Sequence, residues 1–403
     1  MTKNINAVSA KANDQLAYVL INPYTIYKSR TGGVITRLFT RTSLDLVAAT
    51  MFAPSKELVE EYARVVISAK DPQDRKIQEL IRQYILDNYS PDPKTGQHRR
   101  AMMLVFRGED AVKKVRQCVG NFDTTKGVTG ESIRDTYGDF VLTLDGQVKY
   151  FEPAVLAAPE PEEAEIKLKL WAKHAETDGG FLENVVRYPK AAKAEQTLVL
   201  LKPDNFRFPS GRPGNIVDML SRTGLYIIAV KVHRMTVAEA EEFYGPVRLI
   251  LKERLRVVSG QRAKTAVEKE FGFPIPPDIE AQLGEVVGGL NAEDQFNQIV
   301  EFMTGRSPAN CPENEKTMPG KEKMVAVVYE GIDAVTKIRS VLGPTDPRKA
   351  PPGTVRRELG QDIMINAAHA SDSPASAQRE MGIIKIRQNG LKELVEQFYG
   401  CKL

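Results

Sequence analysis

The sequence has few of the residues that build disulfide frameworks or metal clusters, and it has no long apolar run. Among 403 residues only three are cysteine, and Cys118, Cys311 and Cys401 stand far apart. An odd number of isolated cysteines without a CxxC pair predicts reduced thiols and argues against a zinc site. No stretch approaches the roughly 20 apolar residues of a membrane span, and the N-terminus lacks the apolar run of a secretory signal. We therefore expect a cytoplasmic protein without a membrane partner.

A strong excess of either charge is also missing. Lys and Arg number 56 against 52 Asp and Glu, so the formal net charge is only +4. This balance does not call for a nucleic-acid partner, although a local basic cluster could still bind phosphates. At 403 residues the chain is too long for one ordinary core, so we expect two domains.

What the sequence does contain is an internal duplication. Each half is expected to run strand, helix, strand, helix, helix, strand, helix and then a final strand. The expected strands are 16–21, 43–51, 101–106 and 138–143 in the first half and 197–204, 224–230, 323–331 and 362–366 in the second. This order predicts an α+β protein with two ferredoxin-like domains, each a four-stranded antiparallel sheet with helices packed on it. The predicted domains are 1–188 and 189–403.

The two halves differ where chemistry is expected. The first half has Asn22 after its first strand, where the second half has Lys202. At Leu156, the position that best aligns with His369, the first half has no histidine. Unequal repeats of this kind suggest that one half works and the other supports it.

The most suggestive stretch surrounds His369, one of four histidines in the chain. Ser373 and Pro374 predict a helix start, because a capping serine is followed by proline at the first helical position. The field at a helix N-terminus favours bound anions such as phosphate. We interpret His369 as a nucleophile for phosphoryl groups. The alternative is an ordinary surface or hydrogen-bonded side chain, which is our interpretation of the other three histidines.

The second half resembles nucleoside diphosphate kinase over most of residues 195–388. The matching motifs follow one another in the family's order along the chain. They are Lys202-Pro203-Asp204 at the end of 197–204, Tyr244 after a Glu-rich helix, VVYEG at 327–331, Arg339, GPTDP at 343–347, PGTVR at 352–356, and N-x-x-H-x-S-D-S at 366–373 with Glu380. The first half resembles the same fold only through its scaffold.

The resemblance implies phosphoryl transfer through His369. This histidine would accept a phosphoryl group from a nucleoside triphosphate and pass it to a diphosphate in a ping-pong reaction. Glu380 would hydrogen-bond the imidazole and fix its tautomer, and Ser371 would assist through its hydroxyl. Tyr244 would place a phenol near the transferred group.

The resemblance also implies a set of nucleotide-binding residues. Lys202, Arg339 and Arg356 would neutralise the triphosphate, since arginine offers a planar fork to phosphate oxygens and lysine a point charge. Thr345 would add a hydroxyl to the phosphates. Asn366 would bind the ribose hydroxyl together with Lys202.

Two further features of the family have weaker counterparts here. Mg²⁺ would bridge the phosphates and be held mainly by nucleotide oxygens and water. No firm protein ligand is expected, and Asp372 is the nearest candidate for a water-mediated contact. The family clamps the base with an aromatic ring, for which Phe296 is the nearest candidate.

The chain departs from the family pattern at three places. Ala370 follows the histidine, and Arg357 follows Arg356, where the family usually has glycine. A long helical insert at about 246–322 replaces a short helical hairpin, and it is expected to change nucleotide affinity or to contact the other half. Helical stretches are expected at 247–255, 265–271, 278–287 and 293–303, with a proline-rich turn after the second.

Three interpretations stay open. The first is a tandem kinase whose C-terminal domain is active and whose N-terminal copy is a scaffold, with an intrachain pseudo-dimer and possible further oligomers. The second is a nucleotide-binding or structural module of the same fold with little kinase turnover. The third adds a regulatory nucleotide site in the first half, where Arg116 and Arg134 are retained but Asn22 removes a charge.

Overall fold

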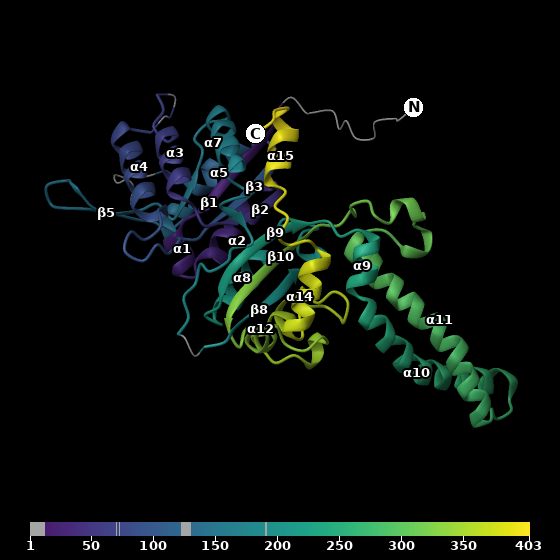
Figure 1. Ribbon diagram of the computed structural model, residues 1–403. Helices are drawn as coiled ribbons and strands as arrows, with labels where there is room; N and C mark the ends of the chain where they lie inside the picture. The colour runs from purple at the N-terminus through teal and green to yellow at the C-terminus, as the bar shows by residue number, and fades with distance from the viewer. Residues whose placement is uncertain (1–12, 70, 72, 122–129, 190–191) are drawn as a thin grey trace, which may run out of the picture. The chain divides into compact units, whose positions relative to one another are not determined.

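The computed structural model describes residues 13–69, 71, 73–121, 130–189 and 192–403 (Figure 1). The chain divides into two compact units. The first runs to Val232 and also contains Val325–Gln378 and Lys385–Leu403, whereas the second contains His233–Met324 and Arg379–Ile384. Both repeated sheets belong to the first unit, and the insert belongs to the second. The predicted boundary at 188/189 thus falls between the two sheets in the sequence and stays a prediction for the domains.

The first repeat builds a five-stranded sheet in the order β6-β1-β3-β2-β7. Its central strands are almost wholly buried, as their continuous apolar sequences require. The strands are β1 (Asp14–Ile21), β2 (Asp45–Phe52), β3 (Ala101–Glu109), β6 (Val155–Ala157) and the short β7 (Gly179–Gly180).

The second repeat builds a four-stranded sheet in the order β11-β8-β10-β9. Its strands are β8 (Ala194–Leu201), β9 (Tyr226–His233), β10 (Met324–Ile332) and β11 (Ala368–Ala370). If the four main strands of each repeat are numbered along the chain, both sheets have the order 4-1-3-2. The described pairings are antiparallel. The predicted duplication and the α+β, ferredoxin-like fold class are confirmed.

The prediction of the last strand was wrong in both repeats. β4 (Asp139–Leu142) does not join the main sheet but pairs with β5 (Val148–Glu152) in a separate two-stranded ribbon. In the second repeat, 362–366 forms a turn because Asp362 Oδ1 accepts hydrogen bonds from the backbone nitrogens of Met364 and Ile365, both at 2.7 Å. Such an Asx turn competes with a strand, and the final strand begins only after it.

Helices follow the strands in both repeats. In the first repeat they are α1 (Pro23–Tyr27), α2 (Thr31–Thr42), α3 (Lys56–Val65), α4 (Arg75–Tyr89), α5 (Ala111–Val119), α6 (Ile133–Tyr137) and α7 (Pro161–Lys173). In the second they are α8 (Arg212–Ser221), α12 (Ala334–Leu342), α13 (Val355–Leu359), α14 (Pro374–Ile383) and α15 (Leu391–Tyr399). Throughout the described ranges, no helix is long and apolar enough to cross a membrane.

The insert forms longer helices than the sequence predicts. In the second unit α9 (Val237–Phe243) precedes α10 (Gly245–Phe271) and α11 (Pro277–Thr304), which lie side by side as a hairpin (Figure 1). The four expected stretches are therefore two continuous helices, and the segments between them, 256–264 and 288–292, contain no proline that would break a helix. The predicted proline-rich turn separates the two helices.

Equivalent helices of the two repeats pack against each other within the first unit. A Cβ added to Gly32 of α2 would collide with the carbonyl oxygen of Gly214 of α8, and a Cβ added to Gly214 would collide with that of Gly32. Glycine is therefore required on both helices for this close approach. Phe39 and Phe206 continue the contact, with ring centroids 5.9 Å apart.

Candidate active site around His369

His369 is the central residue of the edge strand β11. The strand register places it opposite Leu200 of β8, and in the first sheet Leu156 lies opposite Leu20 of β1. Leu20 and Leu200 each stand one residue before the end of their strand. The predicted equivalence of His369 and Leu156 is thus confirmed. The histidine is partly buried, and its strand is held to the sheet by β8 alone.

A constrained turn leads into this strand. Ala367 has a φ of 68°, a left-handed conformation that residues with a Cβ rarely adopt. Its carbonyl oxygen accepts hydrogen bonds from the backbone nitrogen of Lys202 at 3.0 Å and from Nδ2 of Asn205 at 2.7 Å. Ala154, the equivalent residue of the first repeat, has a φ of 60°. The turn therefore belongs to the scaffold of both repeats rather than to the chemistry of one.

Lys202 lies at the centre of the site and is buried. Its Nζ donates to the side-chain oxygen of Asn366 at 2.9 Å and to the backbone oxygen of Met364 at 2.7 Å. Burial lowers the pKa of Lys202 to about 8, and the nearby positive charge of Arg356 acts in the same direction. The structure thus brings Lys202 and Asn366 together, and the buried ammonium of Lys202 is more acidic than that of an exposed lysine.

Arg356 fastens the loops on either side of His369. Its Nη1 donates to the backbone oxygen of Gly343 at 2.9 Å, and its Nη2 donates to that of Ala368 at 3.0 Å. The guanidinium therefore contacts the residue directly before the histidine. These hydrogen bonds go to neutral backbone carbonyls and fix the position of the guanidinium.

Thr345, Arg339 and Ser371 are the other predicted site residues that belong to the first unit. The backbone oxygen of Thr345 accepts a hydrogen bond from Nδ2 of Asn366 at 3.2 Å, while the threonine and Arg339 are exposed. Ser371 is buried directly after β11, where its backbone nitrogen donates to the oxygen of Leu198 at 3.1 Å. Ser371 thus lies two residues after His369, just beyond the end of the strand.

Asp372 and Ser373 connect this strand to α14. Ser373 Oγ accepts a hydrogen bond from the backbone nitrogen of Ser376 at 3.1 Å, which confirms the predicted cap, and the helix begins with Pro374. A hydrogen bond from Ser376 is the main cause that lowers the pKa of Asp372, and the charge of Arg339 contributes. Across the described ranges, no group of three or more His, Cys, Asp and Glu side chains could hold a metal ion.

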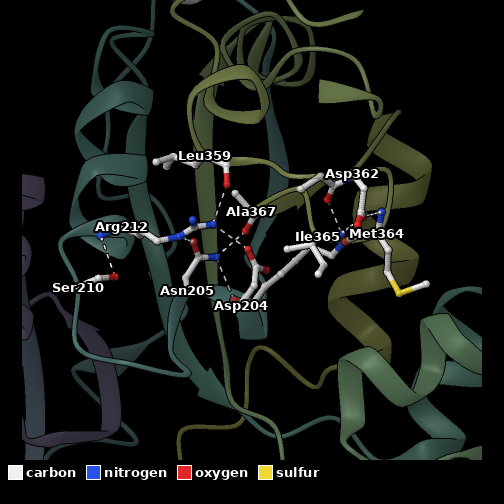
Figure 2. Close-up of polar contacts among 11 residues, drawn as sticks. Asp204, Asn205, Ser210, Arg212, Leu359, Asp362, Met364, Ile365 and Ala367 are labelled. Atoms are coloured by element: carbon white, nitrogen blue, oxygen red, sulfur yellow. Dashed lines mark hydrogen bonds and ion pairs between the residues drawn. The ribbon is translucent and has the colours of Figure 1, made fainter. Parts of the chain in front are cut away.

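A supporting network beneath the site was missed by the sequence reasoning (Figure 2). Arg212, near the start of α8, donates to Asp204 Oδ2 at 2.9 Å, to Asn205 Oδ1 at 3.2 Å and to the backbone oxygen of Leu359 at 2.8 Å. Asn205 in turn holds the oxygen of Ala367. Asp204 of the Lys-Pro-Asp motif thus contacts Arg212, which holds this turn through Asn205. Burial raises the pKa of Asp204. The signal was the motif itself, to which no structural role had been given.

Three predicted site residues belong to the second unit. Tyr244 is buried at the junction of α9 and α10. Glu380 is buried and lies 3.5 Å from Nη2 of Arg379. Phe296 is 1% exposed, and the guanidinium of Arg248 lies 4.9 Å from its ring centroid. A base could stack on Phe296 only after this packing opened, and the predicted roles of these three residues stay predictions.

In the first repeat a buried carboxylate, that of Glu152, contacts Asn22, the counterpart of Lys202. Asn22 Nδ2 donates to Glu152 Oε1 at 3.1 Å, and the Tyr84 hydroxyl donates to Glu152 Oε2 at 2.6 Å. The Tyr89 hydroxyl donates to Asn22 Oδ1 at 2.6 Å. All four side chains are buried, and burial raises the pKa of Glu152. The polar groups of Asn22 and Glu152 are therefore hydrogen-bonded within this half.

Comparisons with known proteins identify similar nucleoside diphosphate kinases. The family model described as "Nucleoside diphosphate kinase" matches residues 290–387. The nucleoside diphosphate kinase of Staphylothermus marinus is 32% identical over 190 residues, which are 47% of this chain and 92% of that relative. The Aquifex aeolicus relative of the same name is 31% identical over 193 residues, covering 47% and 93%. A solved structure of the Aquifex aeolicus enzyme is 30% identical, with coverage of 50% of this chain and 99% of that chain and a TM-score of 0.29.

Proposed function

This chain belongs to the nucleoside diphosphate kinase family, and we propose that it transfers the γ-phosphoryl group of a nucleoside triphosphate to a nucleoside diphosphate. The observation that carries the proposal is the grouping of predicted residues at β11. Lys202 donates to Asn366, and Arg356 donates to the backbone oxygen of Ala368, directly before His369. Two cationic side chains and a candidate nucleophile thus belong to one small region of the second sheet.

We assign the nucleophile's role to His369. A ring nitrogen of the neutral imidazole attacks the γ-phosphorus, and a nitrogen–phosphorus bond forms while the bond to the β–γ bridging oxygen breaks. The diphosphate leaves with that electron pair, and the proton on the other ring nitrogen stays in place. A terminal oxygen of a second diphosphate then attacks the phosphohistidine and restores the imidazole. The reaction is therefore a ping-pong exchange with no net redox change.

The cationic residues supply charge for the phosphates. Lys202 and Arg356 would neutralise oxygens of the transferred group. The exposed Arg339 and Thr345 would contact the remaining phosphates of the nucleotide. Asn366 would bind the ribose beside the lysine. Electrostatic stabilisation of this kind provides most of the catalysis in phosphoryl transfer. The fixed hydrogen bonds of Lys202 and Arg356 support the proposal, because they hold both cations in place before a nucleotide arrives.

Mg²⁺ fits this site as a partner of the nucleotide rather than of the protein. When bound with the nucleotide, it would offset negative charge on the phosphates in the transition state. Asp372 is the one carboxylate that we propose for a water-mediated contact, since the hydrogen bonds that lower its pKa keep it ionised near neutral pH. Reduced, isolated cysteines and nucleotide substrates suit a cytoplasmic setting.

We further propose that the duplication makes an intrachain pseudo-dimer. The reciprocal contact of Gly32 and Gly214 is the kind that a twofold axis produces, because each residue meets its own equivalent. The first repeat would then serve as the scaffold of the second. Assembly of these pairs into larger oligomers is compatible with this arrangement.

A labelling experiment tests the proposed function. The full chain is incubated with γ-labelled ATP and Mg²⁺ and then chased with GDP. We expect an acid-labile, base-stable phosphoprotein whose label moves to GDP, and no label on the His369→Ala variant. His233→Ala is the matched control, because His233 is bonded to Glu239 at 3.0 Å away from β11 and should leave the labelling unchanged.

The same experiment separates the kinase from a binding module. Nucleotide that binds to the wild type without labelling it would favour the alternative of a nucleotide-binding or structural protein with little turnover. Label that persists in His369→Ala would overturn the assignment of the nucleophile.

A further inference from the structure

The hairpin of α10 and α11 has glycine between its helices. A Cβ added to Gly288 would lie 2.6 Å from Cα of Arg256, one on Gly284 would lie 2.5 Å from the carbonyl oxygen of Arg256, and one on Gly260 would lie 2.9 Å from that of Glu280. The two helices therefore touch through their backbones. Leu255 is the one large apolar side chain of α10 that is buried.

Large aliphatic side chains lie on the outside of the same hairpin. On α11, Val286 is 65% exposed and Leu290 is 70% exposed, and on α10 Ile250 and Val257 are 62% and 65% exposed. Ten of the 22 large hydrophobic side chains that are exposed in the described residues belong to this hairpin. They are Leu249, Ile250, Val257, Val258, Phe271, Phe273, Ile279, Val286, Val287 and Leu290.

This arrangement leaves the outer half of the hairpin without a core of its own. Helices in proteins are stabilised mainly by packing of an apolar face, not by propensity alone. At 27 and 28 residues, α10 and α11 are each about 40 Å long, and the outer half of the pair buries almost no side chain. An exposed apolar surface of this extent marks an interaction site.

The spacing of the exposed residues is that of a helical seam. The exposed Ile279, Val286 and Leu290, together with the half-buried Leu283, follow one another at intervals of four, three and four, which places them on one face of α11 as in a coiled coil. On α10, Ile250 and Val257 are seven residues apart. Both helices thus present a stripe suited to another helix.

The charges of the two helices point to the identity of the partner. α10 contains seven Lys and Arg against three Glu, whereas α11 contains six Asp and Glu and no basic residue in its sequence. Within one hairpin the signs already attract, as in the pairs Arg248–Glu293 at 2.5 Å and Arg256–Glu285 at 2.9 Å. A second hairpin related by a twofold axis would place its acidic α11 against the basic α10 of the first. Self-complementarity of this kind is what an isologous interface requires.

We propose that the α10–α11 hairpin is a self-association surface, which pairs with the hairpin of a second copy of this chain to form a four-helix bundle. The aliphatic stripes would make the bundle core, and the oppositely charged helices would set the orientation. The glycines would hold each hairpin thin enough for the outer side chains to meet across the axis. This association adds to any contact that the sheets make.

Mass measurement tests this proposal on the full chain. Light scattering or sedimentation equilibrium over a wide range of protein concentration would compare the wild type with Val286→Gln/Leu290→Gln. We expect the double variant to have half the mass of the wild type, or a self-association weakened on the order of a hundredfold, as loss of two central contacts predicts. Ile166→Gln is the matched control, because Ile166 is an exposed aliphatic residue on the helix α7, and it should leave the mass unchanged.

Two readouts guard against a trivial result. Circular dichroism and phosphoryl transfer should be unchanged in the double variant, which shows that it folds. Hydrogen exchange of the wild type alone should slow at 279–290 as protein concentration rises. Equal masses of wild type and double variant at every concentration, or exchange at 279–290 that is independent of concentration, would overturn the proposal.

Discussion

The two repeats share the contacts that hold the backbone around the edge strand, and they differ in the polar side chains at the end of their first strand. Arg134 donates to the oxygen of Gly120 at 2.7 Å, as Arg356 does to that of Gly343 at 2.9 Å. The left-handed alanine before the edge strand is also present in both. Where the second repeat has Lys202 bonded to Asn366, however, the first has the buried carboxylate of Glu152 bonded to Asn22.

This difference shows which features indicate function. An arginine that holds a glycine carbonyl is part of the fold, so its presence in the first half is weak support for a regulatory nucleotide site there. Asn22 and Tyr84 already donate to the buried Glu152, and Tyr89 donates to Asn22, so these polar groups are bonded within the protein. The lysine and the histidine, which the first half lacks, are therefore the discriminating residues.

Among the substitutions that compare the two repeats, Lys202→Asn, which places the counterpart Asn22 in the second repeat, should have the largest effect on catalysis. Lys202→Asn removes the ammonium and leaves the acceptor on Asn366 without its donor. We expect kcat/KM to fall by about 10²- to 10³-fold, in line with the loss of one preorganised electrostatic group. Steady-state kinetics with ATP and a diphosphate would measure it. A variant that retains the wild-type kcat/KM would show that the lysine does not distinguish the halves.

The equivalent arginines of the two repeats, Arg134 and Arg356, should differ in their effect on catalysis. Arg356→Gln is expected to lower kcat/KM by roughly 10- to 100-fold, since a charge near the phosphates is lost. Arg134→Gln should leave kcat/KM within about twofold but lower the melting temperature, because Arg134 is buried and bonded to backbone oxygens. Kinetics and thermal melts on both variants provide the comparison. Equal losses of activity from the two would contradict it.

The pH dependence should reflect the buried lysine. In the proposed reaction Lys202 must be protonated to attract phosphates, and its pKa of about 8 means that this form is lost as pH rises through 8. We therefore expect kcat/KM, which reports the free enzyme, to decline up to about tenfold per pH unit above that value. In Lys202→Arg the decline should disappear from this range, because arginine stays charged. A Lys202→Arg profile identical to that of the wild type would assign the decline to another group.

The smallest effect on catalysis is expected at the first repeat's carboxylate. Glu152→Ala leaves the buried Asn22 and Tyr84 without their partner, so the free energy of unfolding should fall by about 2–3 kcal/mol. The kcat/KM should not change, and the number of nucleotides bound per chain should stay at one. Urea denaturation and equilibrium dialysis measure these quantities. A second bound nucleotide in the wild type would mean that the first half is a site after all.

Much of the fold could be predicted from the sequence because apolar periodicity marks the strands. Six of the eight expected sheet strands are present, and the duplication was visible from motif order alone. The last strands could not be placed, since β6 and β11 are only three residues long and a local Asx turn at Asp362 imitates the end of a strand. The helices of the insert were underestimated because their outward apolar residues do not follow the pattern of a buried face.

The sequence allowed the main residues of the candidate site to be predicted, but not the residues that hold them in place. Lys202, Asn366 and Arg356 stand in motifs, so they could be named before their contacts were known. Arg212 and Asn205 act through the backbone of Ala367, and contacts of this kind leave no mark in a single sequence. Glu152 could not be anticipated either, because a buried carboxylate is recognised by its partners.

The number and position of phosphoryl groups on the protein test the central claim most directly. After brief reaction with ATP and Mg²⁺, intact-mass and peptide mass spectrometry under alkaline conditions would count and locate them. We predict one phosphoryl group per chain, on His369, which disappears when a diphosphate is added. Two groups per chain, or a group on another residue that turns over with the diphosphate, would contradict it.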